Sequence, residues 1–361
     1  MKLLRRPKLT ALALSAATAL AFLISATTHA DEVKQLHLYN WADYMDPEIL
    51  KNFEKEYNCK VVEDFYDSAE DMMAKLQAGG LSQYDLVGPS NVNVPSFVRL
   101  KLLMPLDKSK LPNLKNLDPS FADSPYDPGN KYTVPYLWGS VGLLYRKDKL
   151  PDFKPTWGAV LDAGKQPGTF LLLDSVRDML DITLIYQGKP INTTDKGDLK
   201  SIADMLVKAK KSDKFMGFEP GVGGKNKVAA GVASVGIVWN GDALQVMKES
   251  EENTKNLAFV LPEEGSIKWV DTLGIPAKAP NPELAHAFIN YLYEPKVAAQ
   301  LANFVQYASP NAAAKEFLTP EDLANPVIYP TEEQLKKLYI SKDLGEDNKL
   351  YDQVWTMVKS R

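Results

Sequence analysis

The stretch from Gln35 to Tyr66, QLHLYNWADYMDPEILKNFEKEYNCKVVEDFY, decides the fold class of this chain. Residues 35–39 have the pattern of a strand, and a helix is predicted to follow, with Asp46 as its N-cap and Pro47 at its first position. A second strand is predicted at Val61–Tyr66 (VVEDFY). The order strand, helix, strand predicts a parallel sheet with helices on both faces.

The same order continues along the chain. Asp67, with Glu70 three positions later, resembles a capping box that opens a helix through Gln77. Tyr84–Ser90 (YDLVGPS) is predicted to be a buried strand that ends in a turn. The remaining predictions are strands at Phe170–Leu173 and Val235–Trp239, helices from about Val176, from Leu199 to Lys210 and from Asn281, and crossing segments between domains at Trp138–Gly142 (WGSVG) and Val260–Gly265 (VLPEEG).

The first 30 residues are interpreted as a cleavable signal peptide. Four basic residues precede an apolar run from Leu9 to Ile24, and Thr28–Ala30 provides a small-residue exit site. The run is shorter than the roughly 20 apolar residues of a membrane anchor. No cysteine stands at the cleavage point, which argues against a lipid anchor, so the mature chain from about Asp31 is expected to be exported and soluble.

The charge of the mature chain is acidic. Without the four basic residues of the leader, the 42 Lys and Arg fall to 38 against 46 Asp and Glu, a net charge of -8. This balance argues against nucleic acid or anionic membranes as partners and is compatible with cationic ones.

Cysteine and histidine usage excludes several kinds of chemistry. Cys59 is the only cysteine, so an intrachain disulfide and a zinc site of thiolates are excluded, and it is interpreted as a partly buried side chain at a strand start. Only His37 and His286 remain after cleavage, and neither suggests a catalytic triad. The glycine-rich stretch at 221–226 (GVGGKN) lacks the spacing of a phosphate loop. No metal and no cofactor is expected.

Three tryptophans near aspartates are the strongest sign of function. Trp41, Trp239 and Trp269 each lie within three residues of an aspartate, and the outermost pair is about 230 positions apart. Indole faces attract cations and cover methylene groups, while carboxylates accept hydrogen bonds from ammonium groups. Ligands of parallel sheets bind beyond the carboxyl ends of strands, where Trp41–Tyr44 and Ser90 are expected. The pattern suits a ligand that is apolar in the middle and positively charged at its ends.

Six strings of sequence carry a resemblance to a known family. YNWADY (39–44), YDLVGPS (84–90), PYLWG (135–139), VWNGD (238–242), WVD (269–271) and YASPN (307–311) occur in the same order as in the periplasmic spermidine/putrescine-binding proteins of ABC importers. The chain resembles that family over essentially the whole mature length.

The resemblance implies a fold and an organisation. The fold is α/β, a two-lobed periplasmic binding protein of type II, with a ligand cleft between lobes that are joined by crossing strands. Residues 31–144 and 262–312 are expected to form the N-terminal lobe, and residues 145–261 and 313–361 the C-terminal lobe. The mature length of about 330 residues independently predicts two domains.

The resemblance also implies the residues of a polyamine site. Aromatic walls are expected from Trp41, Tyr44, Trp239, Trp269 and Tyr307. Ser90 is expected to contact the ligand from a strand end. Carboxylates are expected from Asp43, Asp178, Asp242 and Asp271, of which Asp271 is the central one.

Three differences from spermidine-preferring relatives favour a shorter diamine. Val92 stands where these relatives often have a tyrosine, and Ser175 replaces an aspartate. Asp242 gives the W-x-G-D form of putrescine-preferring members. The sequence therefore leans towards putrescine.

Structural roles compete with the functional ones. Asp242 could cap a helix, and Asp178 could lie in a first turn that the helix dipole favours. The three tryptophans could belong to the core, as Trp138 and Trp157 are expected to do. Because three Trp/Asp pairs occur together at strand ends, the sequence favours the binding-site interpretation over these structural roles.

The leading prediction is a monomeric periplasmic protein, not an enzyme, that delivers a polyamine to the permease subunits of an ABC transporter. The alternatives are a binding protein for another solute, such as an amino acid, opine or metal complex, a sensor that signals to a receptor, and a secreted hydrolase that uses paired carboxylates. A carboxylate ligand would need an arginine, for which Arg177 is the candidate. The paired tyrosines of iron binders are absent from the sequence.

Overall fold

The computed structural model describes residues 33–66, 68–219 and 222–361. The predicted signal peptide at 1–30 and the predicted cap Asp67 lie outside the described residues. Lys34–Arg361 form one compact unit. Within the described ranges, no helix combines the length and the apolar composition needed to span a bilayer.

In the described part of the chain, ten strands form one sheet in the order β2-β1-β3-β9-β4-β7-β5-β6, with β10 on β9 and β8 on β4. The strands are β1 Lys34–Trp41, β2 Cys59–Tyr66, β3 Leu86–Val87, β4 Thr133–Arg146, β5 Phe170–Leu173, β6 Phe215–Glu219, β7 Val235–Trp239, β8 Leu257–Val260, β9 Ser266–Gly274 and β10 Leu338–Tyr339.

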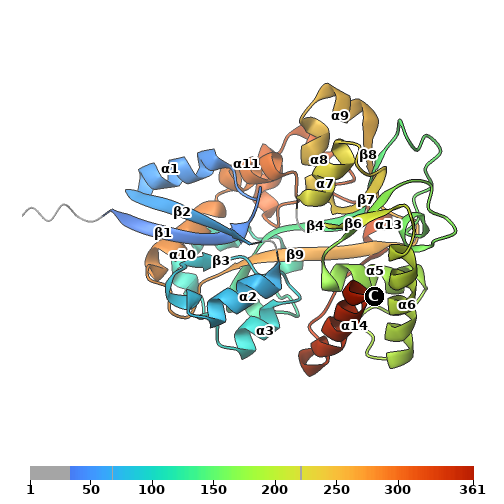
Figure 1. Cartoon of the computed structure of the whole chain (residues 1–361). Helices are drawn as coiled ribbons and strands as arrows, with labels where there is room; N and C mark the ends of the chain where they lie inside the picture. The colour runs from blue at the N-terminus through green and yellow to red at the C-terminus, as the bar shows by residue number, and fades with distance from the viewer. Residues whose placement is uncertain (1–32, 67, 220–221) are drawn as a thin grey trace, which may run out of the picture. The chain divides into compact units, whose positions relative to one another are not determined.

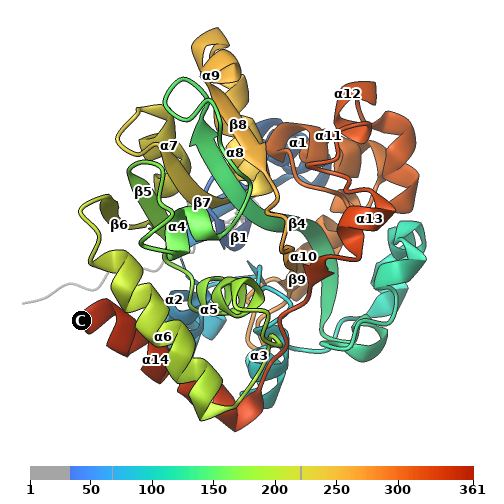
Figure 2. The same cartoon turned by 90° about the vertical axis from the view of Figure 1, so that its right-hand side faces the viewer.

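The α-helices cover this sheet. They are α1 Pro47–Tyr57, α2 Ala69–Gln77, α3 Val94–Arg99, α4 Gly158–Leu161, α5 Val176–Tyr186, α6 Lys196–Lys210, α7 Gly223–Ala229, α8 Asn240–Lys248, α9 Glu251–Asn256, α10 Pro282–Leu292, α11 Pro295–Val305, α12 Pro320–Leu323, α13 Glu332–Leu335 and α14 Asn348–Ser360. Figure 2 shows α5, α6 and α14 side by side below the strands β5, β6 and β7.

The opening strand-helix-strand unit forms as predicted. The Asp46 carboxylate accepts the backbone N–H of Glu48 at 2.9 Å and Pro47 begins α1, which buries Ile49 and Phe53 against the sheet. β1 pairs in parallel with both β2 and β3. The next helix begins two residues after the predicted Asp67 cap, because Ser68 caps α2 by accepting the N–H of Asp71.

Two parts of the sequence prediction need correction. The sheet is mixed rather than parallel, because β4 and β9 pair with each other and with their other main partners in antiparallel fashion. The strand predicted at Tyr84–Ser90 shrinks to Leu86–Val87. The chain continues through Gly88 and Pro89, and a proline has no N–H for a strand ladder.

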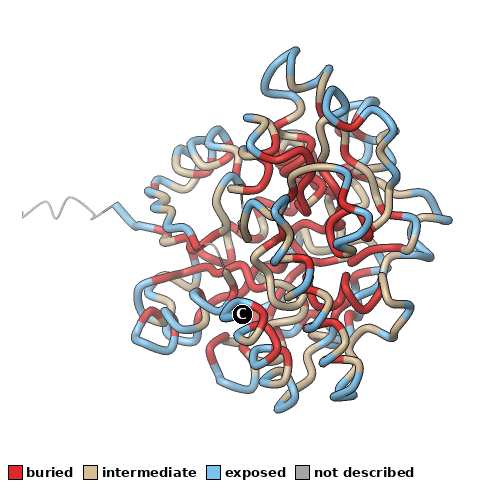
Figure 3. Tube along the Cα trace, turned by 45° about the vertical axis from the view of Figure 1, so that its right-hand side comes forward, coloured by how far each residue is buried: buried red, intermediate tan, exposed pale blue. Residues whose placement is uncertain are grey.

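The long strands β4 and β9 cross the middle of the compact unit. In Figure 1 they run side by side between α1, α10 and β1–β3 on one side and α7–α9 and β7 on the other. Trp138–Gly142 lies within β4, and Val260–Gly265 runs from the end of β8 to the residue before β9, so the proposal that these two segments cross between domains stays a prediction. Figure 3 shows that buried residues gather in the middle of the unit, while exposed residues lie around its outside.

Candidate ligand-binding site

The first wall of the site comes from the ends of two parallel strands. β1 ends at Trp41 and β2 at Tyr66, and the two residues are direct partners in the register. Their ring centroids are 4.5 Å apart. Parallel strands place their carboxyl ends at the same edge of a sheet, so the register alone brings these rings together.

The central carboxylate comes from β9. Trp269 and Asp271 are two residues apart on this strand and therefore point to the same face. Asp271 accepts two hydrogen bonds, from Tyr44 Oη to Oδ2 at 2.8 Å and from Ser90 Oγ to Oδ1 at 2.5 Å. Ser90 and Asp271 also form an isolated antiparallel bridge. Both oxygens of the carboxylate are thus held in place.

Two further carboxylates lie in the first turns of helices that directly follow strands. Asp178 lies at the start of α5, behind β5, and accepts hydrogen bonds from Ser175 Oγ at 3.1 Å and from Trp239 Nε1 at 3.2 Å. Asp242 lies at the start of α8, behind β7. Asp242 does not cap α8, so the cap interpretation of this residue is wrong, whereas Asp178 lies in the first turn of α5, as its helix-dipole interpretation expected.

Tyr307 closes the site because Gly241 leaves room for its ring. A Cβ on Gly241 would lie 2.5 Å from Tyr307 Cε1. The hydroxyl of Tyr307 accepts the backbone N–H of Asp242 at 3.1 Å, and its ring centroid lies 5.0 Å from Trp269. A second small residue has a similar role, since a Cβ on Gly139 would lie 2.5 Å from Trp269 Cζ2.

Nine of the ten predicted site residues line one cavity, which has about 1060 Å³ of empty space when its open mouth is included. They are Trp41, Tyr44, Ser90, Asp178, Trp239, Asp242, Trp269, Asp271 and Tyr307. Asp43 is not among the lining residues. Its side chain is 57% exposed, and its backbone φ of 55° lies in the left-handed region that aspartate tolerates better than most residues.

Burial changes the acidity of the lining carboxylates. It raises the pKa of Asp271 to about 7, although the hydrogen bonds from Ser90 and Tyr44 act in the opposite direction. Burial also raises the pKa of Asp178 to about 6, against the hydrogen bonds from Trp239 and Ser175. The pKa of Asp242 is raised by burial and lowered by the nearby Lys225 ammonium. A cation in the cavity would favour the charged form of all three.

Sequence reasoning missed Lys225. Its ammonium pairs with Asp43 Oδ2 at 3.3 Å and with Asp242 Oδ1 at 3.4 Å. The lysine follows the glycines at 223–224, which the sequence analysis considered only as a failed phosphate loop. A buried lysine close to predicted carboxylates cannot be recognised from spacing, because 182 positions separate Lys225 from Asp43.

Sequence reasoning also missed Tyr66 and Asn91. Tyr66 lines the cavity and donates its hydroxyl to the Gly88 carbonyl at 2.6 Å. Its place at the end of a predicted parallel strand was a usable signal. Asn91 lines the cavity and holds β9, because its N–H donates to the Val270 carbonyl and its Oδ1 accepts the Val270 N–H.

The described residues contain no group of three His, Cys, Asp or Glu side chains that could hold a metal ion. The three remaining tryptophans, Trp138, Trp157 and Trp355, belong to the interior. Trp157 is fully buried and donates Nε1 to the Gly265 carbonyl at 2.8 Å, and Trp138 is also buried.

The mixed α/β sheet and its ring-lined cavity define a class of protein, and comparisons with known proteins agree. Residues 48–331 match the profile of the bacterial extracellular solute-binding proteins, and the chain belongs to this family. The family is one of non-enzymatic binding proteins, so the hydrolase alternative is set aside.

Particular relatives are similar over nearly their whole length. The spermidine/putrescine-binding periplasmic protein of Escherichia coli is 35% identical, covering 96% of this chain and 97% of the relative. The putrescine-binding periplasmic protein PotF of the same organism is 36% identical, with coverages of 93% and 94%. The structure of the spermidine/putrescine ABC transporter substrate-binding protein PotD from Streptococcus pneumoniae superposes with a TM-score of 0.75 at 31% identity, covering 91% of this chain and 99% of that one.

Proposed function

We propose that this chain binds a polyamine in the cavity and delivers it to an ABC importer. The observation that carries the proposal is the state of Asp178 and Asp271. Asp271 is buried and Asp178 half-buried, both receive hydrogen bonds only from neutral donors, and among the described residues neither forms an ion pair. A buried carboxylate is costly unless a cation is paired with it. An entering ammonium group would supply that cation.

The aromatic lining suits the rest of a polyamine. Trp41 and Trp239 lie with ring centroids 6.3 Å apart, and Trp269 packs on Tyr307 elsewhere in the lining. Indole and phenol rings cover methylene groups and attract ammonium groups. The proposed roles of the predicted site residues follow: rings line the alkyl chain and carboxylates bind the charged nitrogen.

The names of the relatives support the same ligand class, since they name spermidine, putrescine or both. One argument for a preference for putrescine is weakened. That argument required Asp242 to bind the ligand, whereas Asp242 is ion-paired with Lys225. Val92 lines the cavity as a small apolar residue, and Ser175 is engaged with Asp178.

We also propose a periplasmic location and action as a monomer. The support is the predicted signal peptide at 1–30 and the periplasmic names of the relatives. The proposed lobes, 31–144 with 262–312 and 145–261 with 313–361, would close on the ligand, and the permease subunits would recognise the closed form. The 144/145 boundary falls near the end of β4, and the 261/262 boundary falls between β8 and β9.

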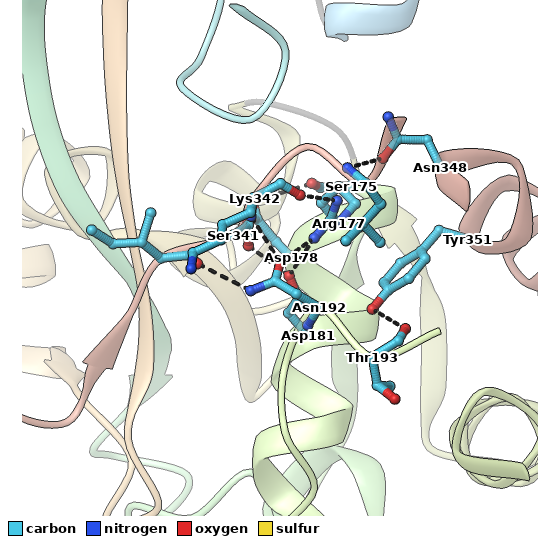
Figure 4. A network of polar contacts seen from close by, with 12 residues as sticks. Ser175, Arg177, Asp178, Asp181, Asn192, Thr193, Ser341, Lys342, Asn348 and Tyr351 are labelled. Carbon is cyan, nitrogen blue, oxygen red and sulfur yellow. Dashed lines mark hydrogen bonds and ion pairs between the residues drawn. The ribbon is translucent and has the colours of Figure 1, made fainter. Parts of the chain in front are cut away.

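A carboxylate-bearing solute is the main alternative, and the state of Arg177 argues against it. Arg177 lines the cavity, but its guanidinium donates to Asp181 at 3.2 Å and to Asn192 at 2.8 Å, as Figure 4 shows. It also donates to the Lys342 carbonyl and stacks on the Tyr351 ring. These partners hold both terminal nitrogens of Arg177 and leave only a buried Nε–H without a partner, so its two-pronged end is not free to bind a ligand carboxylate. A polyamine sensor would use the same site and remains a second proposal for the downstream role.

Isothermal titration of the mature chain tests the proposal. The panel is putrescine, cadaverine, agmatine, spermidine and spermine, with N,N'-diacetylputrescine as an uncharged control of equal chain length and 4-aminobutyrate as a carboxylate-bearing control. We expect at least one polyamine to bind and the diacetyl compound not to bind. Binding of 4-aminobutyrate without binding of any polyamine would contradict the proposal.

A further inference from the structure

Three oxygen acceptors hold the ammonium of Lys225 at one part of the site. Nζ lies 3.3 Å from Asp43 Oδ2 and 3.4 Å from Asp242 Oδ1. The third acceptor is Gln245 Oε1, at 3.0 Å. An ammonium has three N–H donors, so these acceptors use all of them. Its surroundings are those that a bound ligand ammonium would have.

Lys225 is built into the interior rather than placed on the surface. Its side chain is 3% exposed, and that of Asp242 is 9% exposed. Helix α7 can approach β7 closely because Gly224 has no side chain, and a Cβ there would already lie 3.3 Å from Val238 Cγ1. The approach brings Lys225 to the first turn of α8, where Asp242 lies.

The site residues therefore divide into two electrostatic groups. Asp43 and Asp242 share the single positive charge of Lys225, whereas Asp178 and Asp271 are paired with no cation in the described part of the chain. The polyamine hypothesis had assigned all four carboxylates to ligand nitrogens. Only the group of Asp178 and Asp271 lacks an internal cation among the described residues.

We propose that Lys225 determines specificity by filling one ammonium position of the site with its own side chain. The cavity then recognises a single ammonium group of an alkylamine, at Asp178 and Asp271, and gains little from a second one. This inference rests on the proposed function. It assigns the ligand class as alkylamines recognised through one end.

Titration with two ligands of equal carbon number tests the inference. Putrescine carries two ammonium groups on four carbons, and 1-aminobutane carries one. In the unaltered chain we expect their dissociation constants to differ by less than about 10-fold, the lower effect of one hydrogen bond to a charged group. In Lys225→Met, Asp43 and Asp242 lose the lysine charge that competes with a ligand ammonium, and we expect the preference for putrescine to increase by about 10-fold or more.

The matched control is Lys227→Met. Neither lysine is in the cavity lining, but Lys227, on the same helix, pairs with Glu219 instead of the predicted site carboxylates. Lys227→Met should leave the ratio of the putrescine and 1-aminobutane dissociation constants unchanged.

The double variant Lys225→Met/Asp242→Asn removes the buried carboxylate that Lys225→Met leaves unpaired. It should return this ratio to the value of the unaltered chain.

The outcomes separate this inference from the proposed function. If the unaltered chain binds putrescine much more tightly than 1-aminobutane, the inference is wrong. This measurement needs no variant, so the inference can be tested even if Lys225→Met does not fold. A ratio that Lys225→Met leaves unchanged also overturns it, while amine binding itself stands. Absence of binding of both amines to the unaltered chain, together with no binding of the longer polyamines, overturns both.

Discussion

Tyr44 and Asp271 lie 227 positions apart in the chain and are joined by a hydrogen bond of 2.8 Å from Tyr44 Oη to Asp271 Oδ2. The bond links the turn after β1 to the middle of β9, one of the two crossing strands. Asp271 thus has a fixed orientation before any ligand arrives. Preorganised acceptors lose little conformational entropy on binding, which favours a tight site for a cation.

The pH dependence of binding follows from the raised pKa of Asp271, about 7, and of Asp178, about 6. A cation binds the ionised carboxylates, so putrescine affinity should rise between pH 5.5 and 7.5 and then level off. The ligand ammonium groups stay charged throughout, as lysine does. Titration in buffers of different ionisation enthalpy should show proton release near pH 6.5. An affinity that is constant across this range would contradict the assigned carboxylates.

Two tryptophan variants separate the site from the core. Trp239→Phe removes the N–H donor to Asp178 and part of a cavity wall, so polyamine affinity should fall by about 2- to 30-fold, roughly 0.5–2 kcal/mol. Trp157→Phe removes a fully buried hydrogen bond and leaves a small void, so unfolding stability should fall by about 1–3 kcal/mol with little change in affinity. Titration and thermal melts of both variants give the comparison. If Trp239→Phe lowered unfolding stability and left polyamine affinity unchanged, Trp239 would belong to the core.

Much of the fold could be predicted because its signals are local. Asp46 and Pro47 set the start of α1, and the strand and helix that begin at Phe170 and Val176 occur as predicted. The antiparallel crossing by β4 and β9 could not be predicted, because strand direction depends on pairing between distant segments. The register of Trp138 with Val270 in these strands, for example, has no local signal.

The lining of the cavity was predictable to a similar degree. Resemblance and strand-end reasoning placed nine lining residues, because such residues follow predicted strands or lie in distinctive strings. Lys225 was missed because its partners lie in the turn after β1 and in the first turn of α8, and only folding brings these two places together. Gly139 and Gly241 were missed as well, because their role is to leave space for Trp269 and Tyr307, and empty space has no sequence signal.

Gly139→Ala tests the role of that space. The added methyl group would lie 2.3 Å from Asn240 Oδ1 and 2.5 Å from Trp269 Cζ2, so the indole must move. We expect stability to fall by about 1–3 kcal/mol and polyamine binding to weaken. The control is Gly164→Ala, whose new methyl group would meet only Asp162 Oδ1 at 3.6 Å. Equal melting temperatures and affinities for both variants would show that Trp269 is not held by this contact.

The most direct test of the central claim is calorimetry of Asp271→Asn with putrescine at pH 7.5, beside the exposed control Asp152→Asn. The substitution keeps the shape of the side chain and removes the charge that the ligand ammonium would pair with. Removing one partner of a buried charge pair costs about 2–5 kcal/mol, so we predict that binding weakens by about 30-fold or more, while the control binds normally. If Asp271→Asn binds putrescine within about 2-fold of the affinity of the unaltered protein, the loss is far smaller than a buried charge pair requires. That result would contradict the account.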